Sequence, residues 1–243
     1  MEEMKLVASR LEKSFGKSHI IKGLDLECTR GEIIGLLGPN GAGKTTTFYM
    51  IVGLIRPDKG TVMLGECDIT SLDLSGRAKK GIGYLPQEPS VFRGLNVQDN
   101  IAVPLEAKGL KGNDLRQKRD EIISMFGLEH VRKHKAVSLS GGERRRVEIA
   151  RAMALDPLYL LLDEPFAGID PITVKDIQDM IINLKNKRIG VIITDHNVKE
   201  TLKICDRAYI IHQGLVIEEG TPEKVVENDR VKQIYVGKDF SLS

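Results

Sequence analysis

The sequence predicts an α/β protein with an open, mostly parallel sheet, an antiparallel β portion near the N-terminus and an inserted helical subdomain. Short apolar runs alternate with helical patterns, which is typical of buried parallel strands joined by helices. Residues 5–29 partly alternate apolar and polar side chains around the turn signal Gly16-Lys17-Ser18, which favours an antiparallel pair. Residues 96–153 have charged helical faces and few β-like runs, which predicts the insertion.

These patterns divide the chain into an α/β domain over residues 1–220 and a tail over residues 221–243. The helical subdomain is inserted at about residues 88–153. The tail is expected to form one or two short helices and a frayed end. A chain of 243 residues suits one sizeable core with a subdomain.

The first parallel strand is expected at residues 33–38, an apolar run that leads into a glycine-rich loop. A helix follows over residues 45–54 and ends near Gly53 and Pro57. A second clear helix is expected over residues 173–187, because apolar side chains recur there on one helical face. Those side chains are Val174, Ile177, Ile181 and Leu184. The remaining strands are expected at residues 60–65, 82–86, 158–164, 190–196, 207–213 and 215–220.

The charge balance gives no indication of a nucleic-acid partner. The chain has 36 basic and 34 acidic side chains, so its net charge is only +2. Residues 108–119 contain five basic side chains against Asp114, a run that we interpret as a solvated helix face.

Cysteine usage and the length of the apolar runs bear on location. Cys28, Cys67 and Cys205 include no CxxC pair, which favours free thiols in a reducing cytosol over a zinc site or a disulfide framework. The first ten residues lack the apolar core of a signal peptide, and runs such as residues 158–162 are too short to span a bilayer. We expect a cytoplasmic protein; if it works at a membrane, a partner supplies the spanning helices.

Residues 38–45, GPNGAGKT, match the phosphate-binding loop G-x-x-x-x-G-K-[ST] at every fixed position, between an expected strand and an expected helix. Glycines let backbone N–H groups converge on an anion, and the following helix directs its positive end toward phosphate. Lys44 adds a charge near the β- and γ-phosphates, and Thr45 offers a hydroxyl to Mg²⁺. The predicted nucleotide-binding residues here are Gly38, Pro39, Asn40, Gly41, Ala42, Gly43, Lys44, Thr45 and Thr46.

A second element, LLLDE, ends an apolar strand with two carboxylates, Asp163 and Glu164. A magnesium nucleotide needs an acid at a strand end beside the phosphate-binding loop, and Asp163 fits that role, directly or through a water. Glu164 is then free to polarise an attacking water as general base.

Three further residues fit the same scheme. Gln87 follows the strand at residues 82–86 and is predicted to reach Mg²⁺ or the attacking water. His196 follows another core strand and is predicted to hydrogen-bond the γ-phosphate. Phe15 lies before a turn upstream of the loop and is predicted to stack on adenine, although such a residue is more often part of a core.

Together, GPNGAGKT, Gln87, LSGGE at residues 139–143, LLLDE, the loop around Asp170 and His196 resemble the nucleotide-binding subunit of an ABC transporter, over about residues 5–220. The resemblance implies a P-loop NTPase with a RecA-like sheet that hydrolyses ATP with Mg²⁺ and works as a homodimer. In that family the Ser-Gly-Gly turn faces ATP held by a second copy. The residues implied at that contact are Ser140, Gly141, Gly142, Glu143 behind them, and Asp170 at the seam.

Within the family, the stretches FAGIDP, ITDHNVKET and VKQIYVGKDFSLS are similar to a branch that powers lipopolysaccharide export from the bacterial inner membrane. That similarity implies two transmembrane permease subunits, received at a groove near Phe92 and Arg93, and a peripheral location on the cytoplasmic face of the membrane. A loop that packs on its own helical subdomain is the plainer reading of Phe92. Phe240 would, by the same similarity, brace the dimer.

Other functions remain as alternatives. An ATPase subunit of a branched-chain amino-acid importer has a similar size and compact design. A soluble ABC ATPase that acts on DNA or ribosomes is disfavoured, because long coiled coils and a second ATPase half are missing from the sequence. A GTPase switch is disfavoured because the sequence has no NKxD-like guanine reader.

Overall fold

Residues 4–236, which this computed structural model describes, form two sheets and a set of helices around them. The larger sheet has six strands in the order β10-β9-β3-β8-β7-β6, and all neighbours from β9 to β6 are parallel. Only β10 pairs antiparallel, with β9. The strands are β3 (Ile33–Leu37), β6 (Ile82–Leu85), β7 (Tyr159–Asp163), β8 (Gly190–Thr194), β9 (Arg207–His212) and β10 (Leu215–Gly220).

The smaller sheet is the antiparallel portion expected from the alternating pattern. Its strand order is β2-β1-β4-β5, with antiparallel pairing throughout. The strands are β1 (Lys5–Phe15), β2 (Ser18–Thr29), β4 (Lys59–Leu64) and β5 (Cys67–Asp68). The sequence did not predict β5, because two residues are too short for a visible pattern.

The two faces of the six-stranded sheet pack against different elements, because successive side chains along each strand point to opposite faces. Ile33, Leu160 and Ile193 pack on one face against α5 (Gly141–Met153) and α6 (Pro171–Asn186). The opposite face packs against α1 (Lys44–Val52) and the smaller sheet. The predicted apolar stripe of α6 is confirmed, since its four side chains are all buried.

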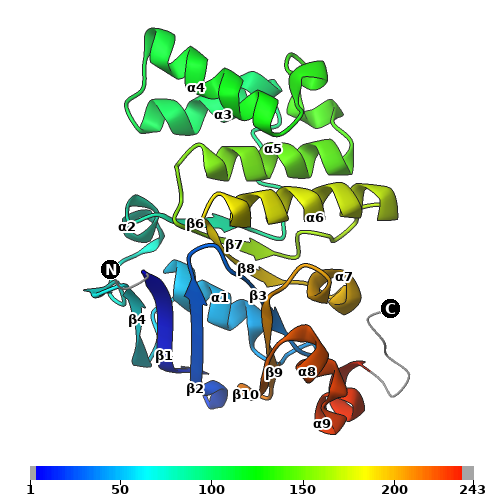
Figure 1. Cartoon of the computed structure of the whole chain (residues 1–243). Coiled ribbons are helices and arrows are strands. Elements are labelled where there is room, and N and C mark those ends of the chain that lie inside the picture. The colour runs from blue at the N-terminus through cyan, green and yellow to red at the C-terminus, as the bar shows by residue number, and fades with distance from the viewer. Residues whose placement is uncertain (1–3, 237–243) are drawn as a thin grey trace.

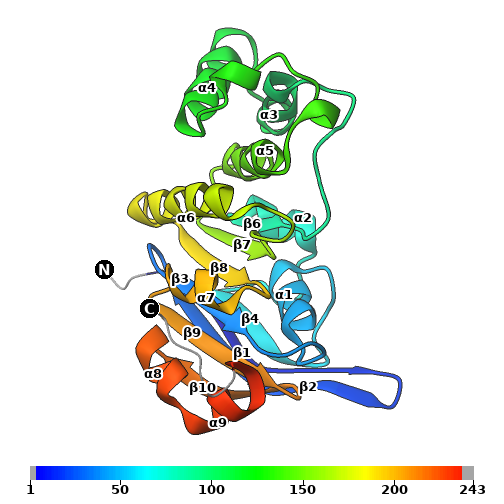
Figure 2. The same ribbon diagram turned by 90° about the vertical axis from the view of Figure 1, so that its right-hand side faces the viewer.

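The segment between β6 and β7 is helical, as predicted. It contains α3 (Val97–Ala107), α4 (Gly112–Met125), α5 and the 3₁₀ turns η1 (Glu129–Val131) and η2 (Ala136–Ser138). Figure 1 shows α3, α4 and α5 stacked beyond α6 at the end of the molecule remote from the smaller sheet, and Figure 2 shows the same separation after a quarter turn. The insertion therefore projects away from the two sheets and does not interrupt the six-stranded one.

Helix α2 (Leu74–Lys79) was not predicted, and its main contribution is Arg77. This side chain is fully buried and donates hydrogen bonds to the carbonyl oxygens of Met50, Ile51, Thr70 and Leu72. Two of these carbonyls belong to the last turn of α1, so the positive charge lies at the negative end of that helix. Burial lowers the pKa of Arg77 to about 10.

The chain continues through α7 (Val198–Leu202), α8 (Pro222–Glu227), α9 (Asp229–Val231) and a π-helical turn, η3 (Lys232–Val236). Helices α7, α8 and α9 cover β9 through Leu202, Val225 and Val231. The predicted short C-terminal helices are thus confirmed up to residue 236, and Phe240 lies outside the described residues. Within residues 4–236, no helix has both the length and the apolar character needed to cross a membrane.

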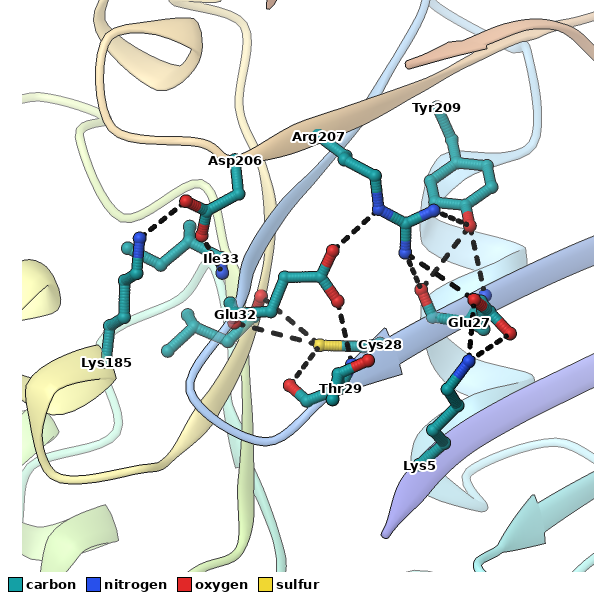
Figure 3. Close-up of polar contacts among 11 residues, drawn as sticks. Lys5, Glu27, Cys28, Thr29, Glu32, Ile33, Lys185, Asp206, Arg207 and Tyr209 are labelled. Atoms are coloured by element: carbon teal, nitrogen blue, oxygen red, sulfur yellow. Dashed lines mark hydrogen bonds and ion pairs between the residues drawn. The ribbon is translucent and has the colours of Figure 1, made fainter. Parts of the chain in front are cut away.

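At the amino-terminal ends of β3 and β9, charged side chains pair with one another and with backbone groups (Figure 3). Arg207 Nε donates to Glu32 Oε1 at 2.6 Å, and Glu32 Oε2 accepts from the N–H of Thr29 at 2.8 Å. Asp206 accepts from the N–H of Ile33 at 2.9 Å and from Lys185 at the end of α6. This network ties both sheets and α6 together at the end opposite to the loop before α1.

Candidate nucleotide-binding site

The predicted phosphate-binding loop connects β3 to α1 at the carboxyl edge of the sheet. Gly43 has φ of 111°, and a Cβ there would lie 2.4 Å from Ile21 Cδ1, so only glycine fits. Lys44 is 9% exposed, and its Nζ donates to the carbonyl oxygens of Gly38 at 2.7 Å and Pro39 at 3.1 Å. Burial lowers the pKa of Lys44, and the charges of Glu164 and Asp163 oppose that shift. The ammonium group is therefore held inside the loop, next to the N–H groups that begin α1.

The two predicted carboxylates lie at the end of β7, beside this loop. Asp163 is 3% exposed, and it lies opposite Thr194 in the register of the parallel strands β7 and β8. Burial raises the pKa of Asp163, and the charge of Glu164 raises it further. The hydroxyl of Tyr84 is 3.4 Å from Asp163 Oδ2. Two adjacent acids at a strand end are thus held close together in a largely buried position, an arrangement that a cation would stabilise.

Glu164 adopts an unusual backbone conformation, with φ of 49°. Non-glycine residues in the left-handed region are strained and occur often at functional sites. Two hydrogen bonds hold the conformation: the N–H of Glu164 donates to Thr194 O at 2.7 Å, and Arg145 Nη2 donates to Glu164 O at 2.9 Å. The turn directs the carboxylate toward Gln87 and His196.

Gln87 and His196 both contact the side chain of Glu164. Gln87 Nε2 donates to Glu164 Oε2 at 2.8 Å, and His196 Nε2 lies 2.7 Å from Glu164 Oε1. Sequence reasoning placed these three residues around a nucleotide but did not predict their mutual contacts. The carboxylate is therefore oriented by one neighbour on each oxygen.

These groups line one cavity of about 540 Å³. The predicted residues that it brings together are Phe15, Asn40, Gly41, Ala42, Gly43, Lys44, Thr45, Thr46, Gln87, Asp163, Glu164 and His196, and the unpredicted ones are Ile20 and Thr194. Phe15 is 52% exposed at the cavity edge, so its ring is not part of a core. Lys13 Nζ lies 5.7 Å from the centroid of that ring. A separate cavity of about 590 Å³ between α6 and α7 includes none of the predicted site residues.

The Ser-Gly-Gly turn does not line this cavity. Ser140 caps α5 in a reciprocal arrangement: the N–H of Glu143 donates to Ser140 Oγ at 3.2 Å, and the N–H of Ser140 donates to Glu143 Oε2 at 2.8 Å. Ser140 is therefore the N-cap of α5. Gly141, at the first turn of the same helix, instead borders a smaller neighbouring cavity with Gln87 and Glu164.

Asp170 also lies outside the main cavity, at the start of α6. Its carboxylate accepts from the N–H groups of Ile172 and Thr173 at 3.1 and 3.0 Å, and from the Thr173 hydroxyl at 2.6 Å. The Thr173 hydroxyl and N–H lower the pKa of Asp170. The methyl group of Thr173 contacts Gly142: a Cβ on Gly142 would lie 2.2 Å from Thr173 Cγ2. The Asp170 loop and the Ser-Gly-Gly turn are therefore in direct contact.

Sequence reasoning missed Arg145, which connects three of the motifs. It is 6% exposed and donates to the carbonyl oxygens of Asp163, Glu164, Pro165 and Pro86 at 2.9 to 3.2 Å. Its Nη1 also lies 3.1 Å from Glu148 Oε2. The run of three arginines after LSGGE contained this residue, but nothing in the run marks the middle arginine as the buried one.

Phe92 and Arg93 lie in the exposed loop between β6 and α3. Phe92 is 44% exposed, and the guanidinium carbon of Arg151 lies 4.4 Å from its ring centroid. Asn100, fully buried, holds the loop in shape, because its side chain accepts from the N–H of Phe92 at 2.8 Å and donates to Phe92 O at 3.1 Å. The loop thus presents an aromatic ring and an arginine on a rigid support.

Comparison with known proteins agrees with this geometry. Residues 21–167 match the family described as ABC transporter. The lipopolysaccharide export system ATP-binding protein LptB of Haemophilus influenzae is 52% identical over 238 residues, which cover 98% of this chain and 99% of that protein.

Two solved structures show the same fold. A nucleotide-free ATP-binding cassette from an ABC transporter aligns with a TM-score of 0.88 at 28% identity and covers 97% of this chain and 100% of its own. A dimeric cassette in a post-hydrolysis state, bound to ADP and Pi, aligns with a TM-score of 0.79 at 27% identity and covers 89% of this chain and 98% of its own. With the P-loop, the paired carboxylates and the Ser-Gly-Gly cap in place, the chain belongs to the ABC transporter family as one of its ATPase subunits.

Proposed function

We propose that this chain powers lipopolysaccharide export by binding and hydrolysing ATP as the cytoplasmic subunit of an inner-membrane ABC transporter. The observation that carries the proposal is the 52% identity to a lipopolysaccharide export ATP-binding protein along almost the full length of both chains. The cavity supports the ATP-hydrolysing part of the proposal, because it combines a phosphate-binding loop with two acids and a histidine.

Magnesium fits the cavity because its donors include the oxygen ligands that this ion prefers. The Thr45 hydroxyl, the Gln87 amide and the Asp163 carboxylate all line the same space. They would hold Mg²⁺, which supplies positive charge to the phosphates when bound. Lys44 and the N–H groups that begin α1 bind the β- and γ-phosphates, and Phe15 stacks on adenine.

Glu164 acts as the general base. Its carboxylate accepts a proton from the attacking water, while Gln87 keeps Oε2 oriented. His196 hydrogen-bonds the γ-phosphate once the nucleotide is bound. Arg145 donates to the backbone carbonyls of Asp163 and Glu164 and so fixes the main chain from which the carboxylate extends.

A second copy of the chain completes the site. Ser140, Gly141 and Gly142 lie outside the cavity of their own chain, with N–H groups at the positive end of α5. In a head-to-tail dimer they contact the nucleotide held by the partner subunit, with Glu143 behind them and Asp170 at the seam. The solved relative that is a dimer with bound ADP and Pi supports the dimeric part of this proposal. Removal of the γ-phosphate then weakens the dimer.

The exposed loop at Phe92 and Arg93 is the contact for two membrane-spanning partner subunits. An aromatic side chain beside an arginine is a frequent combination at protein interfaces. On this proposal residues 1–220, with the insertion at about 88–153, form the motor, and the tail from residue 221 extends the dimer contact.

Two experiments test the proposal. Affinity purification of the chain from membranes should recover two membrane subunits with lipopolysaccharide, and recovery of an amino-acid permease instead would overturn the assignment. Phe92→Ala should reduce recovery of the membrane subunits several-fold and leave ATP hydrolysis by the isolated chain unchanged. An equal loss of both would refute the assignment of this loop.

A further inference from the structure

The nucleotide cavity contains one polar side chain that the proposed function leaves without a role, Thr194. This residue ends β8 and lines the cavity between Asp163 and His196. It is 1% exposed, and its Oγ1 has no hydrogen-bond partner within residues 4–236. Buried hydroxyl groups without a partner are rare because each loses its hydration on folding and gains nothing in return.

Strand pairing shows what the Thr194 hydroxyl faces. Thr194 is directly opposite Asp163 in the β7–β8 register, so the two side chains extend from the same face of the sheet. Alternation along β8 identifies that face: Ile192 packs on the α1 side and Ile193 on the α6 side, which places Thr194 on the α1 side. The side chains of Thr194 and Asp163 are therefore neighbours on the side of the sheet that carries the phosphate-binding loop.

The carbonyl of Thr194 has a separate and satisfied role. It accepts the N–H of Glu164 at 2.7 Å and so supports the strained backbone of the general base. Since that contact uses the main chain, a substitution of the side chain leaves it in place. The hydroxyl can therefore be changed without removing the support of Glu164.

We propose that the Thr194 hydroxyl, together with Asp163, holds a water in the hydration shell of the nucleotide's magnesium ion. The inference rests on the proposed function, because it needs a magnesium nucleotide in this cavity. Mg²⁺ keeps several waters in protein sites, and groups that hydrogen-bond such waters tune the affinity for the ion. A hydroxyl suits this position because it adds a donor and an acceptor beside Asp163 without adding charge next to two carboxylates.

The test compares Thr194→Val, which keeps the shape of the side chain and removes the hydroxyl, with Thr194→Ser, which keeps the hydroxyl. Binding of ADP is measured by calorimetry in the presence of Mg²⁺ and again in EDTA, with Mn²⁺ binding to the protein–ADP complex followed by electron paramagnetic resonance. Thr194→Val should weaken Mn²⁺ binding about tenfold and leave ADP affinity in EDTA unchanged. Thr194→Ser should restore most of the metal affinity.

Thermal unfolding of the nucleotide-free protein supplies an independent readout. Because the hydroxyl has no partner in the folded chain, its removal in Thr194→Val should raise the melting temperature, or leave it unchanged, rather than lower it. The matched control is Thr201→Val, on α7. That hydroxyl is buried and donates to Asn197 O at 2.9 Å, so its loss should lower the melting temperature and leave metal affinity unchanged.

The possible outcomes separate the two proposals. Wild-type Mn²⁺ affinity in Thr194→Val, or an equal loss of ADP binding with and without metal, would overturn the role of Thr194 alone. A lower melting temperature in Thr194→Val would show that the hydroxyl is already satisfied within the fold, which also overturns it. If the wild-type chain binds neither ADP nor ATP, the proposed function fails together with the inference.

Discussion

The two ends of the parallel sheet use charged residues in opposite ways. At the amino-terminal ends of the strands, Glu32, Asp206 and Arg207 find partners within the chain, and the network ties both sheets together (Figure 3). At the carboxyl ends, Asp163 and Glu164 lie side by side, Glu164 has a strained backbone and Thr194 has an unpartnered hydroxyl. One end stabilises the fold, and the other end retains unfavourable interactions that the proposed magnesium nucleotide would relieve.

This contrast distinguishes a structural charge cluster from a functional one. Both ends contain carboxylates and a basic side chain, so composition alone does not separate them. What differs is whether the polar groups are satisfied within the chain. Substitutions at the two ends should therefore change stability in opposite directions.

The largest expected effect is on catalysis at the carboxyl end. Glu164→Gln removes the base and keeps the size and hydrogen-bonding shape of the side chain, so ATP hydrolysis should fall by about 10²–10⁴-fold while ATP binding is retained. Steady-state phosphate release and equilibrium ATP binding measure the two quantities. Hydrolysis at a near wild-type rate would show that Glu164 is not the base.

At the amino-terminal end, Glu32→Gln should lower the free energy of unfolding by about 1–3 kcal/mol, because it removes the negative charge that pairs with Arg207 and one of the two oxygens that accept from Arg207 and Thr29. Both side chains are partly exposed, at 29% for Arg207 and 15% for Glu32, which places the effect toward the lower part of that range. Urea denaturation measures the change. Nucleotide affinity should remain that of the wild type, and a loss of affinity would contradict the separation of the two ends.

Asp163→Asn should stabilise the protein at neutral pH, in contrast to Glu32→Gln, and raise the free energy of unfolding by about 0.5–2 kcal/mol. The pKa of Asp163 is raised by burial and by Glu164, so its ionisation in the folded state opposes folding. Stability from this group is complete below its unfolded pKa and is lost as pH rises through the folded pKa.

Denaturation midpoints across the acidic pH range check this prediction. The wild type should lose part of its stability as pH rises through that interval, and the variant should lack this component. A destabilised Asp163→Asn at neutral pH would mean that the carboxylate is satisfied within the chain after all, and the contrast between the two ends would disappear.

The smallest effect is expected at the edge of the cavity. Phe15→Ala should weaken ATP binding by about twofold to tenfold, the range that corresponds to one aromatic stacking contact, and Phe15→Tyr should bind ATP like the wild type. Calorimetric titration with ATP distinguishes the two. Unchanged binding in Phe15→Ala would place adenine elsewhere.

The main elements of the fold follow from the sequence because periodicity and turn signals are local. All described strands except β5, together with α6, were predicted from their apolar patterns, and the P-loop from its fixed spacing. Helix α2 was missed because six residues with a central glycine carry no amphipathic stripe. Its main contact, between Arg77 and the end of α1, depends on tertiary packing and leaves no local pattern in the sequence.

The composition of the candidate site was largely predictable, but its internal contacts were not. Residues that follow core strands meet at one sheet edge, which is why Gln87, Asp163, Glu164 and His196 could be grouped in advance. The buried position of Arg145 and the unpartnered hydroxyl of Thr194 depend on how α5 packs and on strand register, which no short pattern records.

The contact between Gly142 and Thr173 has a mechanical consequence. Because Gly142 has no side chain, the methyl group of Thr173 packs directly against the backbone at the start of α5, and a displacement of the Asp170 loop is transmitted to that helix end. In the proposed head-to-tail dimer, the Ser-Gly-Gly turn contacts the partner's nucleotide, so this contact would couple the Asp170 loop of one chain to the nucleotide held by the other.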